Sequence, residues 1–170
     1  MIGFVLMSLA AAKTQDTTAF LDAVAAIVET AMSEVSVDSW SRGGLYINIT
    51  SFSVLGSVAG SQEVTNSDVR KAVGREFQDL APGPIVACTA LPPPSTDREC
   101  STPHGGLCIV LNGLLRVANG YEATLTVAWT RGSPIDDRKH VLSSTIRFRL
   151  RYEDRVWKVE DRTVLSRAFY

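Results

Sequence analysis

The stretch that decides the fold is Val141–Leu165, which reads VLSSTIRFRLRYEDRVWKVEDRTVL. Large apolar side chains alternate there with arginines, namely Ile146, Phe148, Leu150 and Tyr152 with Arg147, Arg149 and Arg151. Alternation with a period of two predicts a strand with one apolar and one solvated face. With a turn at residues 153–154, the returning strand pairs Leu150 with Trp157. The pattern therefore predicts an amphipathic hairpin with Trp157 on its apolar face.

Helices are predicted ahead of this hairpin. Side-chain oxygens at residues 16–18 are suited to cap a helix, and apolar residues follow them at helical spacing. A second helix is predicted from Val69 to Leu80, because Thr65 and Asp68 have the spacing of a capping box. The Pro-Gly-Pro sequence at 82–84 ends this helix.

The segments between and after these helices predict short strands and one long loop. Alternating residues predict a strand that starts at Leu45 and continues towards Val54. Residues 84–88 read as a short apolar strand, whereas residues 89–106 contain three successive prolines and no periodic pattern. A loop of this length inside a compact domain is uncommon and is often functional.

A second hairpin is predicted in the middle of the chain. Residues 107–117 and 121–130 both have strand character, and Asn119-Gly120 between them is a strong signal for a tight turn. The first strand changes its alternation at Asn112-Gly113, which indicates a β-bulge. The order of elements predicts an α+β fold in which N-terminal helices pack on a curved, mainly antiparallel sheet.

The first twelve residues, MIGFVLMSLAAA, carry no charge and precede Lys13. A run of this length is too short to span a bilayer as a helix. Ala10-Ala11-Ala12 fits a signal-peptide cleavage site, although the usual basic residues ahead of the apolar run are missing. A secretory signal, a retained anchor and a core element all remain open. Residues 13–170 are expected to form one domain in a periplasmic or secreted protein, which residues 1–12 attach to the membrane if they are retained.

Composition excludes a strong nucleic-acid binder. The chain has 170 residues, 45% hydrophobic content, a formal net charge of −1 and a pI of about 6.1. Residues 1–85 carry 5 basic and 9 acidic side chains, whereas residues 86–170 carry 12 and 9. The second half is thus mildly basic, which is typical of a solvated surface or of a docking face.

The closing hairpin resembles that of the NTF2-like superfamily, whose domains often end with a strand, a charged turn and a Trp-Lys-aliphatic step. The matching residues are Glu153, Asp154, Trp157, Lys158 and Val159. The resemblance implies a sheet that curves around helices and forms a cone-shaped pocket. Relatives include hydrolases, isomerases and cyclases as well as non-catalytic binding domains, so the fold alone does not decide the activity.

Three cysteines surround the long loop. In an exported protein we expect at least one disulfide that includes Cys108. Cys100–Cys108 is the favoured pair, ahead of Cys88–Cys108, and Cys88–Cys100 is the least favoured. Cys100, His104 and Cys108 also stand four residues apart, but the neighbouring proline and glycines disfavour a helix, and we expect no metal site.

Candidates for a pocket are few, and no catalytic constellation or cofactor motif stands out. Asn112 and Arg116 are the polar residues on strands whose inner faces are otherwise aliphatic. Asp136, Asp137 and His140 would form an acid–base group if they faced a pocket, and a solvated connection is the alternative. We therefore expect no cofactor, and the enzyme hypothesis stays secondary.

A row of arginines marks the candidate docking face. Arg147, Arg149 and Arg151 share the solvated face of one strand, with Lys158 beside them. In the predicted register Glu160 lies opposite Arg147 and neutralises the row only in part. Such a row is either a plain exposed face or a surface for an acidic partner or anionic headgroups.

These observations favour a non-catalytic exported binding or accessory subunit. We expect it to dock on a partner protein or a membrane-associated complex, with lipid-interface contact through residues 1–12. A homodimer is also compatible with the sequence. The alternative is an NTF2-like pocket enzyme, a hydrolase or isomerase acting on a small apolar ligand.

Overall fold

The computed structural model describes the backbone of residues 3–35, 43–52, 64–95, 98–118, 120–132, 139–154 and 156–170. Side chains are described for the same residues except 3–16, 104, 131, 132 and 139. Asp136 and Asp137 lie outside these ranges.

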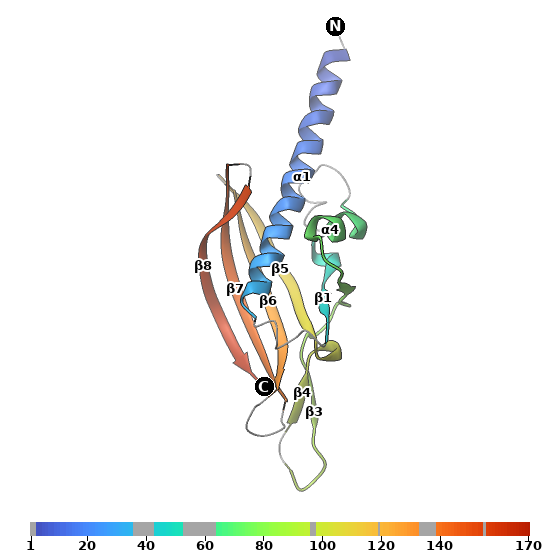
Figure 1. Cartoon of the computed structure of the whole chain (residues 1–170), viewed down its shortest axis with the longest axis vertical. Helices are drawn as coiled ribbons and strands as arrows, with labels where there is room; N and C mark the ends of the chain where they lie inside the picture. The colour runs from blue at the N-terminus through green and yellow to red at the C-terminus, as the bar shows by residue number, and fades with distance from the viewer. Residues whose placement is uncertain are drawn as a thin grey trace.

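The chain opens with one long helix, α1 (Gly3–Ser33). The predicted caps at residues 16–18 are wrong, because no breaker interrupts the helix formers upstream and the helix simply starts earlier. From Phe20 onward the apolar stripe is buried as predicted. The N-terminal turns of α1 project beyond the sheet, which its later turns cover (Figure 1). In the described part of the chain, no helix combines the length and apolarity that a membrane span needs.

The second helix, α4 (Asn66–Val73), is shorter than predicted. Its capping box is confirmed: the Asp68 backbone N–H donates to the Thr65 hydroxyl at 3.2 Å, and the Thr65 N–H donates to the Asp68 carboxylate at 2.9 Å. The predicted continuation to Leu80 is wrong because Gly74 caps the helix in the left-handed region, with φ 64°.

Strand β1 (Leu45–Ile47) is also shorter than predicted. Residues 49–52 are helical, so the strand does not continue towards Val54. The physical reason is Asn48, whose side-chain oxygen accepts a hydrogen bond from the Ser51 N–H at 3.2 Å and thus starts a helical turn.

The main sheet has six strands in the order β2-β1-β5-β6-β7-β8. Its other strands are β2 (Gln78–Asp79), β5 (Leu107–Val117), β6 (Gly120–Gly132), β7 (Lys139–Glu153) and β8 (Val156–Phe169). Strand β1 runs parallel to β2 and β5, and the remaining pairs are antiparallel. The sheet is thus mixed but mainly antiparallel, and the α+β class is confirmed.

Both predicted hairpins are present in this sheet. Val117 pairs with Gly120, and the register shifts between Leu111 and Gly113, which confirms the bulge at Asn112. At the second turn Glu153 pairs with Val156, one position later than predicted.

The later turn slides the register of β7 and β8 by two residues. Trp157 pairs with Tyr152 rather than Leu150, but an even shift leaves it on the predicted face, where it packs against the core. Arg147 lies opposite Thr163, so its predicted pairing with Glu160 is wrong.

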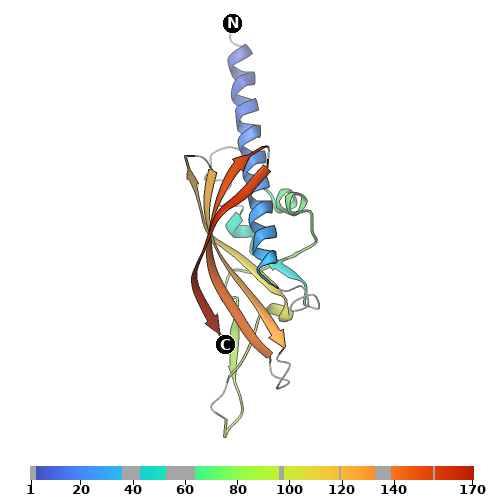
Figure 2. The ribbon, with the colours of Figure 1, turned by 60° about the vertical axis from the view of Figure 1, so that its left-hand side comes forward.

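The main core lies between α1 and the inner face of β5–β8. Its largest fully buried side chains include Phe52, Phe148, Ile27, Leu125 and Leu150. The long sheet strands curve along the helix, as Figure 2 shows. A smaller cluster of Tyr46, Leu80 and Cys108 forms a second core.

The predicted irregular loop contains a separate two-stranded ribbon, β3 (Ala87–Ala90) with β4 (Arg98–Ser101). Its strands are antiparallel, and a short 3-10 turn (Pro103–Gly105) leads from it into β5. The ribbon extends beyond one end of the main sheet, and the N-terminus lies beyond the other end (Figure 1). The expectation that residues 89–106 lack regular structure is therefore wrong.

Candidate functional site

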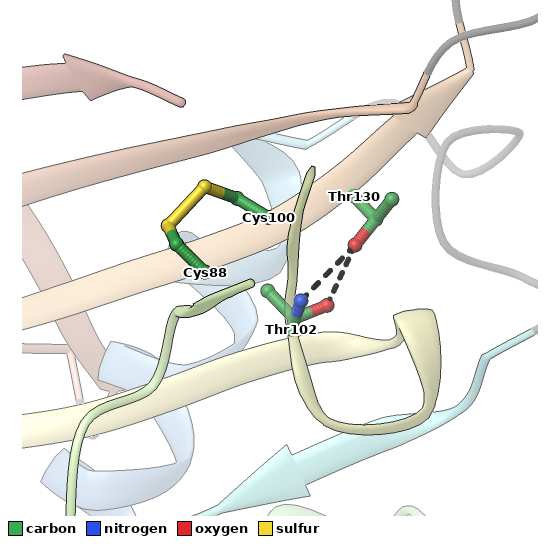
Figure 3. The surroundings of a disulfide bond; sticks show 4 residues. All are labelled: Cys88, Cys100, Thr102 and Thr130. Atoms are coloured by element: carbon green, nitrogen blue, oxygen red, sulfur yellow. Dashed lines mark hydrogen bonds between the residues drawn. A yellow bond between two sulfur atoms is a disulfide. The ribbon is translucent and has the colours of Figure 1, made fainter. Parts of the chain in front are cut away.

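The ribbon is held by a disulfide between Cys88 and Cys100. These residues face one another across the two strands, with their Cα atoms 4.0 Å apart (Figure 3). A disulfide was predicted and is present. The prediction that it includes Cys108 is wrong, because strand pairing places the other two cysteines side by side.

Beyond the disulfide, the ribbon is anchored to the sheet through Thr102. The backbone N–H of Thr102 donates to the Thr130 hydroxyl at 3.3 Å, and the two hydroxyl oxygens are 2.9 Å apart (Figure 3). The Thr102 hydroxyl also donates to the Gly106 carbonyl at 2.8 Å. The ribbon is therefore held at its base, while the rest of it is open to solvent.

Cys108 is a free, buried thiol at the start of β5. Burial away from water raises its pKa to about 12, because the thiolate is poorly solvated there. A thiol of this kind is neither a nucleophile nor a metal ligand at neutral pH. Of the set Cys100, His104 and Cys108, Cys100 is also lost as a metal ligand, because it is part of the disulfide. The described residues contain no other cluster of side chains that could hold a metal ion.

The inner face of the sheet leaves one small cavity near the C-terminal end of α1, with a volume of about 190 Å³. Its described lining residues are Glu34, Trp129, Leu142, Ser143, Ser144, Ile146, Arg162, Arg167, Ala168 and Phe169. Glu34, directly after the end of α1, forms an ion pair with Arg162 of β8. The lining is thus mixed, with its carboxylate already neutralised by a guanidinium.

The predicted pocket residues do not lie among these lining residues. Asn112 is exposed and donates its side-chain amide to the Thr126 hydroxyl at 2.7 Å. Arg116 is exposed near the end of β5, and His140 is exposed near the start of β7. The structure therefore does not bring Asn112, Arg116 and His140 together around the cavity.

The predicted docking residues do share one face. Arg147, Arg149 and Arg151 are all exposed on the side of β7 that faces away from α1. Arg149 lies 3.7 Å from the carboxylate of Glu122, and Arg151 lies 3.6 Å from that of Glu160. No ion pair with Arg147 occurs within the described residues.

Lys158 at the start of β8 is the most strongly paired member of the basic set. Its ammonium group lies 3.1 Å from Glu153 and 3.2 Å from Asp154. The hydrogen bond from Lys158 lowers the pKa of Glu153, and the hydrogen bond to Glu153 raises the pKa of Lys158. The set therefore divides into one paired lysine, two loosely paired arginines and one arginine, Arg147, with no ionic partner in the described part of the chain.

The Glu34–Arg162 pair was not predicted, because a bulge at Glu160 in β8 changes the face on which Arg162 lies. The register skips Glu160 opposite Arg149 and Leu150, which changes the face of the residues from Asp161 up to the second bulge at Leu165. Arg162 consequently lies on the α1 side of the sheet, where it pairs with Glu34 while remaining partly exposed. An arginine in an otherwise alternating strand gives no signal of this without the position of the bulge.

Comparison of the chain with protein-family models, curated proteins and solved structures yields no match.

Proposed function

We propose that this protein is a non-catalytic accessory subunit of NTF2-like architecture that binds an acidic surface of a protein partner. The proposed binding surface is the solvent-facing side of β7, formed by Arg147, Arg149 and Arg151 with Lys158 at its edge. In this proposal the protein is exported, and residues 1–12 contact the lipid interface of a membrane-associated complex.

The NTF2-like assignment is supported by one long helix lying along a curved, mainly antiparallel sheet (Figures 1 and 2). The cavity beside Glu34 lies between this helix and β7–β8, where the cone of that architecture would open. The charged turn and Trp157 supply the motif on which the resemblance rests.

The observation that carries the binding role is the weakness of the ion pairs along the arginine row. Exposed pairs contribute about 0–1 kcal/mol, and those of Arg149 and Arg151 are long. Carboxylates of a partner therefore displace Glu122 and Glu160 at little cost, while Arg147 is available already. The neighbouring Thr145 and Thr126 hydroxyls, 3.2 Å apart, add polar groups to the same surface.

Export is supported by the Cys88–Cys100 disulfide, because such bonds persist mainly in oxidising compartments. The disulfide fixes a ribbon that has little buried surface, which is a common role for disulfides in secreted proteins.

A second candidate is binding of a small ligand in the inner cavity, and Arg162 and Arg167 in its lining favour an anionic group. Two facts weigh against it. About 190 Å³ is below the roughly 300–1,000 Å³ typical of ligand pockets. Glu34 already satisfies Arg162, so a ligand has to break this ion pair.

The proposal is tested by replacing Arg147, Arg149 and Arg151 together with serine. Each surface change is expected to alter stability by no more than about 0.5 kcal/mol, so the fold should remain. We expect the variant to lose its partner in co-purification from the native compartment, and we expect wild-type binding to weaken as salt rises.

A control variant removes the same charge elsewhere, at exposed or half-exposed positions away from this face. Lys71, Arg75 and Arg98 are suitable, because Lys71 and Arg75 belong to α4 and the turn after it, and Arg98 belongs to the ribbon. Equal partner recovery with the arginine-row variant and the wild type contradicts the proposal. An equal loss of partner recovery with both triple variants shows a general effect of charge and also contradicts the proposal.

A further inference from the structure

The N-terminal turns of α1 project past the sheet as one continuous helix (Figures 1 and 2). Residues 1–12 carry no charged side chain, and Lys13 carries the first one in the sequence. At 1.5 Å per residue, helical residues 3–12 extend over about 15 Å. This is about half of the roughly 30 Å hydrocarbon core of a bilayer, so the segment is long enough to enter one leaflet but not to cross both.

Two hairpin tips lie beside the middle of α1, at the end of the sheet from which its first turns project (Figures 1 and 2). They join β5 to β6 and β7 to β8. Large apolar side chains are exposed at these tips: Leu115 is 63% exposed, Tyr152 51% and Val156 55%. We call these three the tip residues. Side chains of this size that gather at one exposed end usually mark a contact surface.

We propose that this end of the sheet rests on a phospholipid bilayer, with the tip residues in the interface and the first turns of α1 in the adjoining leaflet. The inference rests on the proposed lipid contact of residues 1–12 and extends it to the sheet. It is tested separately from the docking of a protein partner, by vesicle binding instead of partner recovery, because Arg151 lies beside Tyr152 and Arg149 lies level with Leu115 across the sheet.

The chemistry of the tips favours a lipid interface over an acidic protein partner. Lys158 is paired with both Glu153 and Asp154, so the turn offers an acidic partner no excess of positive charge from these three residues. The ring of Tyr152 packs against that of Trp157 in a tilted arrangement, with ring centroids 5.1 Å apart. Tyrosine and tryptophan beside apolar side chains are typical of the boundary between headgroups and acyl chains. Binding is therefore driven by apolar contact and depends little on lipid charge.

The continuity of α1 connects the two contacts. No break occurs in α1 between Gly3 and Ser33, and the helix is packed on the sheet from Phe20 onward. The depth of the apolar turns in the leaflet therefore fixes the height and orientation of the sheet. In this orientation the tip residues face the headgroups and the disulfide-linked ribbon points away from the membrane.

The test measures binding of the full chain to phosphatidylcholine vesicles, with and without phosphatidylglycerol, by flotation. A variant with Leu115→Ser, Tyr152→Ser and Val156→Ser should bind at least about tenfold more weakly than the wild type. The matched control carries Leu165→Ser, Phe169→Ser and Tyr170→Ser. These residues are also exposed but lie towards the other end of β8, and the control should bind as the wild type does.

Three outcomes overturn the inference. If the tip variant binds vesicles as strongly as the wild type does, the tip residues do not contact lipid. If deletion of residues 1–12 abolishes binding in that case, the proposed lipid contact of the helix stands and only its extension fails. Equal weakening of both triple variants indicates non-specific apolar adsorption. The wild type could also fail to bind vesicles and form a dimer that the three tip substitutions dissociate. This end of the sheet would then be an interface between two copies of the chain.

A second measurement reports orientation directly. A chain whose only tryptophan is Trp157 should be quenched by lipids brominated close to the headgroup. A chain whose only tryptophan is Trp129, which lines the cavity beyond the middle of the sheet, should not be quenched. Equal quenching of the two reporters contradicts the proposed orientation.

Discussion

Loss of the Cys88–Cys100 disulfide should open the ribbon without unfolding the sheet. The two cysteines are 12 residues apart in sequence. Closing a loop of this size reduces the entropy of the unfolded chain and contributes about 3 kcal/mol at 25 °C. In a chain of this length, 1 kcal/mol shifts Tm by about 2–4 °C. If the ribbon unfolded together with the sheet, the loss would lower Tm by about 6–12 °C.

The structure indicates a smaller shift because the ribbon is peripheral. Every residue of β3 is exposed, and within β4 only Cys100 is buried. An isolated pair of strands is marginally stable in water. Without the disulfide, we therefore expect the ribbon to open by itself, with the sheet held by its own core. The Tm of the remaining domain should fall by about 4 °C or less.

The assay combines thermal unfolding with limited trypsin digestion of a Cys88→Ala/Cys100→Ala variant. Cleavage after Arg98, which is exposed in β4, should accelerate strongly, while cleavage after Arg147 in the middle of β7 should not change. A fall in Tm of about 6–12 °C with no faster cleavage at Arg98 would instead show that the ribbon and sheet unfold together.

Three further predictions concern the core and its titratable groups. Trp157→Ala should lower the free energy of unfolding in urea by about 2–3 kcal/mol, since the side chain is only partly buried. Trp157→Phe should lower it by less than about 1 kcal/mol, because this change also removes a buried indole N–H that has no acceptor among the described residues. Equal losses in the two variants would contradict this expectation. Cys108 should resist iodoacetamide at pH 8 until the protein unfolds, when one thiol is counted. Because burial raises its pKa to about 12, the contribution of Cys108 to stability is complete below the unfolded pKa of about 8.5–9 and is lost as pH rises through the folded pKa of about 12. The Cys108→Ala variant should lack this pH dependence. Glu34→Gln should lower the free energy of unfolding by about 1 kcal/mol or less, because its ion pair with Arg162 is partly solvated, and a loss above 3 kcal/mol would mean a fully buried pair.

Local patterns predicted much of the fold. The capping box at Thr65 and the bulge at Asn112 are short-range features in which the residues that make the structure are neighbours in sequence. The alternating strands predicted the two long hairpins for the same reason. The errors arise where a single residue ends an element, as Gly74 does for α4 and Asn48 does for β1. Hydrophobic spacing alone does not show these stops.

The candidate site was harder to predict because it depends on long-range register. A turn displaced by one position changed the neighbours of the whole arginine row, and a bulge at Glu160 turned Arg162 inward. The predicted disulfide pairing was wrong for a similar reason. Three cysteines allow three pairings, and only the pairing of strands β3 and β4 brings Cys88 next to Cys100. Exposure of the arginines followed from simple alternation and was therefore predicted correctly.

Site-specific photo-crosslinking in cells that produce the protein tests its proposed contact function most directly. A photoreactive amino acid is placed at Arg147 on the arginine row, at Phe169 in the lining of the cavity, and at Lys71 on α4 as a control. We expect one discrete protein adduct from position 147 and none from the other two positions. An adduct from position 169 with none from position 147 would contradict it, and would place the function in the cavity.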